Sequence, residues 1–141
     1  NPRPRLFRLV EDRAVINRMG FNNEGMEAAA SRIGAVARQH RAGPLGINIG
    51  ANKDSEDRIA DYEKAMARLA PLADYVTVNI SSPNTPGLRA LQDKSALDDL
   101  LLRVRAVAPD GPPLFLKVAP DLEPADIDDI AAVAIERGIE L

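Results

Sequence analysis

Residues 75–80 read Tyr-Val-Thr-Val-Asn-Ile, a short apolar run with a single amide near its end. Two similar apolar runs, at 45–49 and 114–118, lie on either side of it in the sequence. Each run carries one hydrophilic side chain at a similar place: Asn48, Asn79 and Lys117. The length and composition of these runs predict three β-strands.

Strand side chains alternate between the two faces of a sheet, so the polar and apolar residues of each run separate. The predicted apolar face consists of Ile47, Ile49, Val76, Val78, Ile80, Leu114, Leu116 and Val118. The hydrophilic side chains Asn48, Asn79 and Lys117 would point to the other face, at equivalent depths. Burying two amides and an ammonium group without partners is costly, so we expect a ligand to meet them there.

Helical spacing of apolar residues separates these runs. Apolar residues from Ile59 to Leu69 recur at three- and four-residue steps, which predicts a helix closed by Pro71. Those from Leu97 to Val107 predict a second helix, for which Ser95 with Asp98 makes a capping box. Strand and helix therefore alternate along the chain.

The same reading extends to both ends of the sequence. Two short extended runs within residues 5–17 predict a small hairpin, followed by a loop at 18–23. Residues 24–39 predict an amphipathic helix, and residues 124–138 predict another that follows the last strand. Residues 139–141 are typical of the start of a further strand.

Alternating apolar strands and helices predict parallel strands with helices outside, in either an open doubly wound sheet or a (β/α)8 TIM-type barrel. A complete barrel takes about 250 residues, and this chain supplies roughly half of the required units. We therefore expect residues 1–141 to be one part of a barrel domain whose N- and C-terminal portions are missing.

Composition excludes several classes of function. The formal net charge is −3 and the basic residues are scattered, so no nucleic-acid surface is predicted. The chain has no cysteine, which excludes disulfides and thiolate chemistry, and no metal-ligand spacing is present. There is no apolar stretch of membrane-spanning length.

The loop from Asn79 to Arg89 is the richest in chemistry. It contains two prolines and a glycine, and it leaves a strand at the end where barrel enzymes place their active sites. A stiff loop can hold Ser82 and Asn84 in fixed directions, although an ordinary turn has a similar composition. Together with Asn48 and Lys117, the loop favours a functional site.

Motifs spread along the chain resemble the class 2, quinone-linked dihydroorotate dehydrogenases. The motifs are Asn-Pro-Arg-Pro-Arg-Leu-Phe (1–7), Asn-Arg-Met-Gly-Phe-Asn-Asn (17–23), Gly-Ile-Asn-Ile-Gly (46–50), the 79–88 loop and Lys-Val-Ala-Pro-Asp-Leu (117–122). The resemblance implies a TIM barrel that holds FMN and oxidises dihydroorotate to orotate by hydride transfer to the flavin. Electrons would pass on to a quinone, within pyrimidine biosynthesis. We expect the 141-residue segment alone to be inactive.

The resemblance also implies roles for single residues. Ser82 stands where the family keeps its catalytic base. The cofactor-binding residues would be Asn48, Asn79 and Lys117. The substrate-binding residues would be Asn17, Arg18, Met19, Gly20, Phe21, Asn79 and Asn84. Amides offer both donors and acceptors, which suits a pyrimidine or a flavin edge, and the charge of Lys117 would favour the reduced flavin.

Serine at position 82, where the family's cytosolic class carries cysteine, favours the quinone-linked class. That class implies a peripheral position on the cytoplasmic side of the cell membrane, through a segment absent from this chain. Two alternatives remain open at this point. One is another flavin-dependent barrel oxidoreductase, and the other is a non-catalytic α/β binding module whose asparagines are satisfied strand polar groups.

Overall fold

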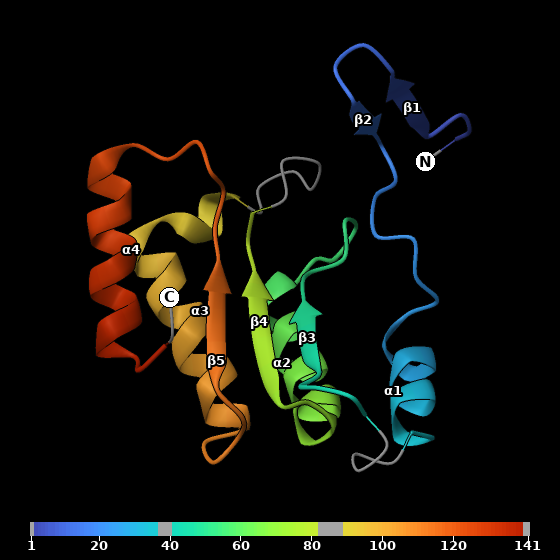
Figure 1. Ribbon diagram of the computed structural model, residues 1–141. Helices are drawn as coiled ribbons and strands as arrows, with labels where there is room; N and C mark the ends of the chain where they lie inside the picture. The colour runs from blue at the N-terminus through green and yellow to red at the C-terminus, as the bar shows by residue number, and fades with distance from the viewer. Residues whose placement is uncertain (1, 37–40, 82–88, 140–141) are drawn as a thin grey trace.

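The computed structural model describes residues 2–36, 41–81 and 89–139 (Figure 1). An antiparallel pair contains β1 (Leu6–Leu9) and β2 (Ala14–Asn17). A parallel sheet has the order β3 (Gly46–Ile49), β4 (Tyr75–Asn79) and β5 (Leu114–Lys117). The α-helices are α1 (Met26–Gly34), α2 (Arg58–Leu69), α3 (Lys94–Val107) and α4 (Pro124–Glu136). The predicted hairpin and the alternating parallel arrangement are both confirmed.

The register of the parallel sheet confirms the predicted division into two faces. Val76 lies opposite both Ile47 and Leu114, and all three side chains are buried. The predicted equal depth of the polar residues is wrong, however. Asn79 lies opposite Lys117, whereas Asn48 lies opposite Thr77, two residues nearer the start of β4. This difference in depth arises because each strand begins to pair at a different point of its apolar run. The amino-acid composition of a run does not show where pairing begins.

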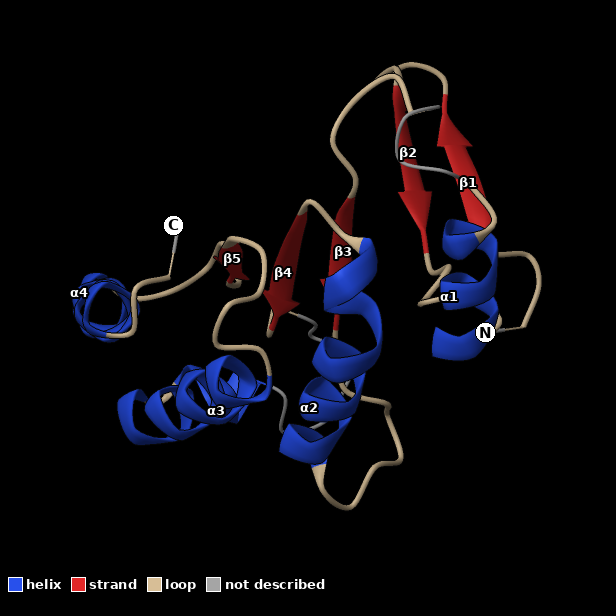
Figure 2. Ribbon diagram, turned by 90° about the horizontal axis from the view of Figure 1, so that it is seen from below, coloured by secondary structure: helices blue, strands red, loops and turns tan. Residues whose placement is uncertain are grey.

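The helices that follow the strands cover the apolar face. Figure 2 shows α2 and α3 together on one side of β3 and β4. Helix α2 contributes buried Tyr62, Met66 and Leu69, and α3 contributes Leu97, Leu100, Leu101 and Val104. This layer of aliphatic contacts forms the core, because it removes the greatest apolar area from water. No helix within the described ranges is long and apolar enough to cross a membrane.

Ion pairs fasten each of these helices to the next. Arg103 of α3 makes two hydrogen bonds to the carboxylate of Glu63 on α2, at 2.9 and 2.7 Å. Arg137, just after α4, binds Asp98 of α3 in the same two-pronged way, at 2.6 and 2.8 Å. The paired guanidinium holds the pKa of Asp98 below its usual value. Such two-pronged pairs add geometric specificity to the packing of neighbouring helices.

The other face of the sheet changes character along its length. At its N-terminal end the Tyr75 ring lies over Gly46, where an added Cβ would come within 2.0 Å of the ring. The same ring meets Phe115 edge-on, with centroids 5.3 Å apart. At the C-terminal end this face carries Asn79 and Lys117 instead. The polar groups are therefore concentrated at one end of the sheet.

The first helix is shorter than predicted. It spans Met26–Gly34 rather than 24–39, and the backbone N–H of Val36 turns back to the carbonyl of Ile33. Glycine is a weak helix former, which suits an end at Gly34. The remainder of the predicted helix, at 37–39, lies outside the described residues.

The predicted capping box at α3 is also wrong. Asp93, not Ser95, is the N-cap, and its Oδ1 accepts hydrogen bonds from the backbone N–H groups of Ser95 and Ala96. Ser95 lies inside the first turn and donates its hydroxyl to Asp93. Asp98 binds Arg137, so it is not part of a cap.

We predict that Asp93→Ala lowers the melting temperature of the full-length protein by about 2–4 °C, and that Ser95→Ala lowers it less. The Ser95 hydroxyl, followed by the N–H groups of Ala96 and Ser95, lowers the pKa of Asp93 from 3.8. The stabilisation is thus complete above pH 3.8 and is lost as the pH falls through the lower folded-state pKa. Thermal unfolding at pH 7 and in strong acid measures this loss. An Ser95→Ala variant as unstable as Asp93→Ala would contradict the assigned cap.

Candidate functional site

Four polar side chains meet where the three parallel strands end. Asn79 Nδ2 donates to Asn48 Oδ1 at 3.2 Å, which joins β4 to β3. Ser81 Oγ donates to Asn79 Oδ1 at 2.7 Å, and Lys117 Nζ of β5 donates to Ser81 Oγ at 2.7 Å. We call Asn48, Asn79, Ser81 and Lys117 the strand-end cluster. The structure thus brings the three predicted residues Asn48, Asn79 and Lys117 together, despite their unequal depths.

One backbone group fixes the orientation of the two asparagine amides in the strand-end cluster. The N–H of Ser81 can only donate, and it donates to Asn79 Oδ1 at 3.1 Å. The amide of Asn79 is therefore oriented with Nδ2 toward Asn48, whose oxygen must accept. This leaves the Nδ2 group of Asn48 and further N–H groups of Lys117 without a partner among the described residues. The strand-end cluster consequently presents donors to a ligand.

Burial divides the strand-end cluster into an anchor and a rim. Asn79 is 7% exposed, the one buried polar residue in the described part of the chain. Asn48 and Lys117 are exposed, and Ser81 lies between these extremes. A buried amide needs its hydrogen bonds, because unpaired polar groups in the interior are costly. Asn79, the buried anchor, is therefore held in place by its hydrogen bonds, whereas Asn48 and Lys117 form an accessible rim.

Tyr62 supports the same strand end from the helical layer. Its side chain is fully buried, and its hydroxyl donates to the carbonyl oxygen of Asn79 at 2.8 Å. Burial is the largest influence on this phenol and raises its pKa to about 12. Tyr62 therefore remains a protonated donor throughout the neutral range.

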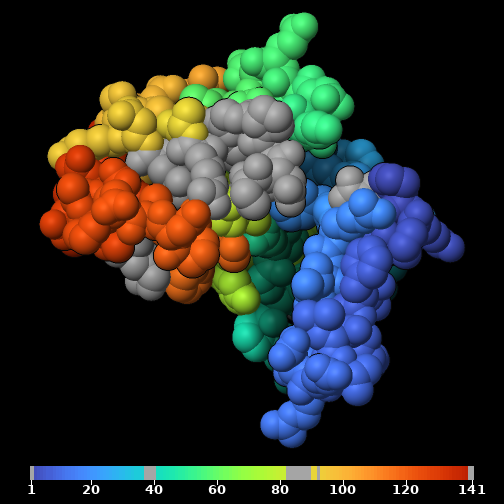
Figure 3. All heavy atoms as spheres, turned by 90° about the horizontal axis from the view of Figure 1, so that it is seen from above, coloured from blue at the N-terminus to red at the C-terminus, as the bar shows by residue number. Residues whose placement is uncertain are grey.

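The predicted substrate residues Asn17 to Phe21 comprise the end of β2 and the segment that follows it. The space-filling view shows the N-terminal part of the chain, in blue, at one side of the molecule (Figure 3). Asn17 Oδ1 accepts from the Met19 N–H at 3.2 Å, and Arg18 Nε donates to the Pro4 carbonyl at 2.9 Å. Gly20 adopts a φ of 70°, and the Phe21 side chain is largely exposed. These contacts are local to the hairpin segment, so a shared pocket with the strand-end cluster stays a prediction.

Two further predicted residues, Ser82 and Asn84, lie outside the described residues. Ser81, by contrast, was not among the predicted site residues, although it connects Lys117 to Asn79. Its position directly after an apolar strand could have indicated it, because side chains there face the carboxyl end of a parallel sheet.

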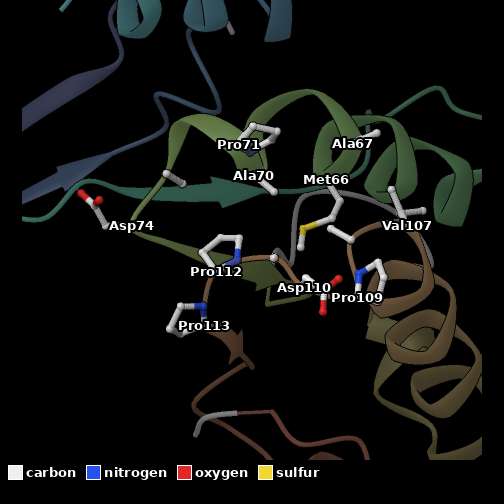
Figure 4. A pocket seen from close by; sticks show the side chains of 13 residues that line it. Met66, Ala67, Ala70, Pro71, Asp74, Val107, Pro109, Asp110, Pro112 and Pro113 are labelled. Atoms are coloured by element: carbon white, nitrogen blue, oxygen red, sulfur yellow. The ribbon is translucent and has the colours of Figure 1, made fainter. Parts of the chain in front are cut away.

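A large cavity lies at the opposite end of the sheet (Figure 4). It has a volume of about 670 Å³ and is lined by Met66, Pro71, Asp74 and Pro112, among others. Asp74 is bound there by Arg41 and by the N–H of Leu45. Parallel α/β proteins carry out chemistry at the carboxyl ends of their strands, whereas the other end serves stability. The strand-end cluster is therefore the better candidate site, although it lies outside this cavity.

Comparison with known proteins identifies relatives along the whole chain. The family model described as dihydroorotate dehydrogenase matches residues 1–141. A protein of Sphingopyxis alaskensis named dihydroorotate dehydrogenase (quinone) is 72% identical over 141 residues, covering 99% of this chain and 40% of the relative. A protein of the same name from Erythrobacter litoralis is 64% identical, with the same two shares. The chain thus spans about 40% of the length of these curated relatives.

Solved structures agree with the sequence matches. The crystal structure of an Eimeria tenella DHODH in complex with ferulenol has a TM-score of 0.90 and 36% identity. It is matched over 99% of this chain and 44% of its own. The parallel strands and helices described above are accordingly part of a TIM-type barrel. From the full-length family match and these relatives, we conclude that the chain belongs to the dihydroorotate dehydrogenase family.

Proposed function

We propose that the protein containing this chain oxidises dihydroorotate to orotate in pyrimidine biosynthesis, with FMN as its cofactor and a quinone as electron acceptor. Family membership and the names of the relatives support the reaction. The observation on this chain that carries the proposal is the strand-end cluster, which directs hydrogen-bond donors outward from the carboxyl ends of three parallel strands. Barrel enzymes place their reaction chemistry at this edge.

The donor set fits a flavin ring. Flavin ring edges carry carbonyl oxygens and ring nitrogens that accept hydrogen bonds, and the outward groups of Asn48 and Lys117 are donors. Asn48, Asn79 and Lys117 would hold FMN. When bound, FMN would supply the two-electron acceptor for the hydride. The Lys117 ammonium, bound to the Ser81 hydroxyl, would keep a positive charge beside the ring.

We further propose that Asn17 to Phe21, Asn79 and Asn84 hold the pyrimidine and that Ser82 accepts its proton. A serine hydroxyl is a weak base, so this step requires a closed pocket that excludes water. Ser82 follows Ser81, a member of the strand-end cluster, directly in the sequence. The hairpin segment would complete the pocket from the side.

The remaining proposals concern parts of the protein beyond these residues. The relatives' names support a quinone as the electron acceptor. We propose that the protein reaches the quinone at a membrane surface, where it would be peripheral on the cytoplasmic side. Barrels bind phosphate near their last strands. We propose that residues 1–141 form one part of the barrel domain, and that the FMN phosphate site is built by later segments.

We predict that the full-length protein is yellow and oxidises dihydroorotate with a quinone faster than with fumarate or NAD. The isolated 141-residue chain should be inactive, because it lacks the proposed phosphate site. Orotate formation and quinone reduction, measured in parallel, provide the test. A colourless full-length protein that does not bind FMN would instead support a non-catalytic binding module. A preference for fumarate or NAD would contradict the quinone assignment.

We predict that Lys117→Met weakens FMN binding by about 10- to 100-fold and Asn48→Ala by about 3- to 10-fold, because a charged donor contributes more than a neutral one. Fluorescence titration of each apoprotein with FMN measures the dissociation constants of the two variants. Lys64→Met is the matched control, because Lys64 is an exposed lysine on α2. If Lys64→Met weakened binding as much as Lys117→Met, the effect would be general charge and the proposed contact would be wrong.

We predict that Ser82→Ala leaves FMN bound but slows anaerobic bleaching of the flavin by dihydroorotate about 10²- to 10⁴-fold, as loss of a general base does. Stopped-flow absorbance measures the rate. The control is Ser95→Ala, which removes a serine from the first turn of α3. Its flavin should be reduced at the wild-type rate. Near-normal reduction in Ser82→Ala would remove Ser82 from the mechanism.

A further inference from the structure

The hydrogen-bond ladder between β3 and β4 stops just before the strand-end cluster. Its last pair is Ile49 with Val78. Continuing this register would place Gly50 opposite Asn79, and the N–H of Ala51 would then donate directly to the Asn79 carbonyl. Instead, that carbonyl accepts the hydroxyl of Tyr62 at 2.8 Å.

The Tyr62 oxygen also lies near the segment that follows β3. The Ala51 backbone lowers the pKa of the phenol, against the larger effect of burial. A nearby N–H favours the charged form of a phenol, so the Ala51 N–H faces the Tyr62 oxygen. One hydroxyl therefore stands between the two backbone groups that the next rung of the ladder would join.

Among the described residues, the Ala51 N–H makes no direct hydrogen bond to the Asn79 carbonyl, and the Tyr62 hydroxyl occupies this carbonyl instead. The missing rung lies beside the side-chain contact between Asn48 and Asn79, at 3.2 Å. The position of Tyr62 thus bears directly on the geometry of the strand-end cluster.

We propose that Tyr62 is a positioning residue: its hydroxyl sets the spacing of β3 and β4 at their carboxyl ends, and thereby the placement of the Asn48–Asn79 pair toward the cofactor. The inference rests on the proposed function for the identity of that cofactor. Tyr62 itself is fully buried in the helical layer, so it acts through the strand ends and not by touching a ligand.

A phenylalanine at this position would fill the same space without the hydroxyl. It would leave the Asn79 carbonyl and the Ala51 N–H either unpaired in the interior or closed onto each other in a direct rung. Both outcomes move the strand ends, whereas a residue serving only to fill the core would tolerate the change. Tyr62→Phe therefore separates the positioning role from packing.

The test uses the full-length protein, with Val104→Ala as a control that perturbs a buried core residue on α3. Both variants are compared with wild type at a temperature where circular dichroism shows all three to be folded. The readouts are the FMN dissociation constant of the apoprotein, the visible spectrum of the bound flavin, and hydrogen exchange at the Ala51 amide.

Tyr62→Phe should weaken FMN binding by about 3- to 10-fold, the effect of one hydrogen bond, shift the flavin spectrum and change exchange at Ala51. Val104→Ala should leave all three readouts near wild type. Equal behaviour of the two variants would overturn the inference. If wild type itself does not bind FMN, the proposed function fails. Hydrogen exchange at the Ala51 amide then tests the spacing role by itself. A change in this exchange that is confined to Tyr62→Phe supports the role, and no change refutes it.

Discussion

A single hydrogen bond, from the backbone N–H of Ser81 to the side-chain oxygen of Asn79, orients the asparagine amides of the strand-end cluster. A backbone N–H cannot accept, so it orients the Asn79 amide, which in turn orients Asn48. Lys117 enters the same chain through the Ser81 hydroxyl. The donors that remain point away from the buried anchor. A donor-lined edge selects ligands that are rich in acceptors, as flavins and pyrimidines are.

The fold supplies the position of this cluster, and the helical layer supplies its rigidity. Parallel strands bring their carboxyl ends to one edge, where loops from successive units converge. This face of the sheet is aromatic around Tyr75 and Phe115 at the other end, whereas Asn79 and Lys117 lie at this edge. The aliphatic layer of α2 and α3 anchors the strands from behind, and Tyr62 reaches from that layer to the strand end. The hydrophobic core and the strand-end cluster are thus joined by a direct hydrogen bond.

Sequence patterns predicted the elements and faces well, because alternation and helical spacing are local properties of the chain. They gave the strand of Asn48 the correct face but the wrong depth, because register depends on how neighbouring strands meet. The predicted cap at Ser95 was wrong because serine and aspartate both cap helices, and only the backbone path shows that Asp93 is the cap. Tyr62 matched a core position by its spacing, and nothing local showed that its hydroxyl bridges two strands. Ser82 and Asn84 rest on the resemblance of their loop to the family.

The most direct test of the central claim follows the asparagine side-chain amides of the full-length protein by NMR, with ¹⁵N-labelled asparagine, as FMN is added. We expect large shifts of the Asn48 and Asn79 side-chain signals, because these amides would lie at the proposed FMN site. Asn52, whose side-chain amide is bound to Asp61, should move little. Unchanged Asn48 and Asn79 signals during saturating FMN binding would show that the cofactor lies elsewhere and would contradict the assignment.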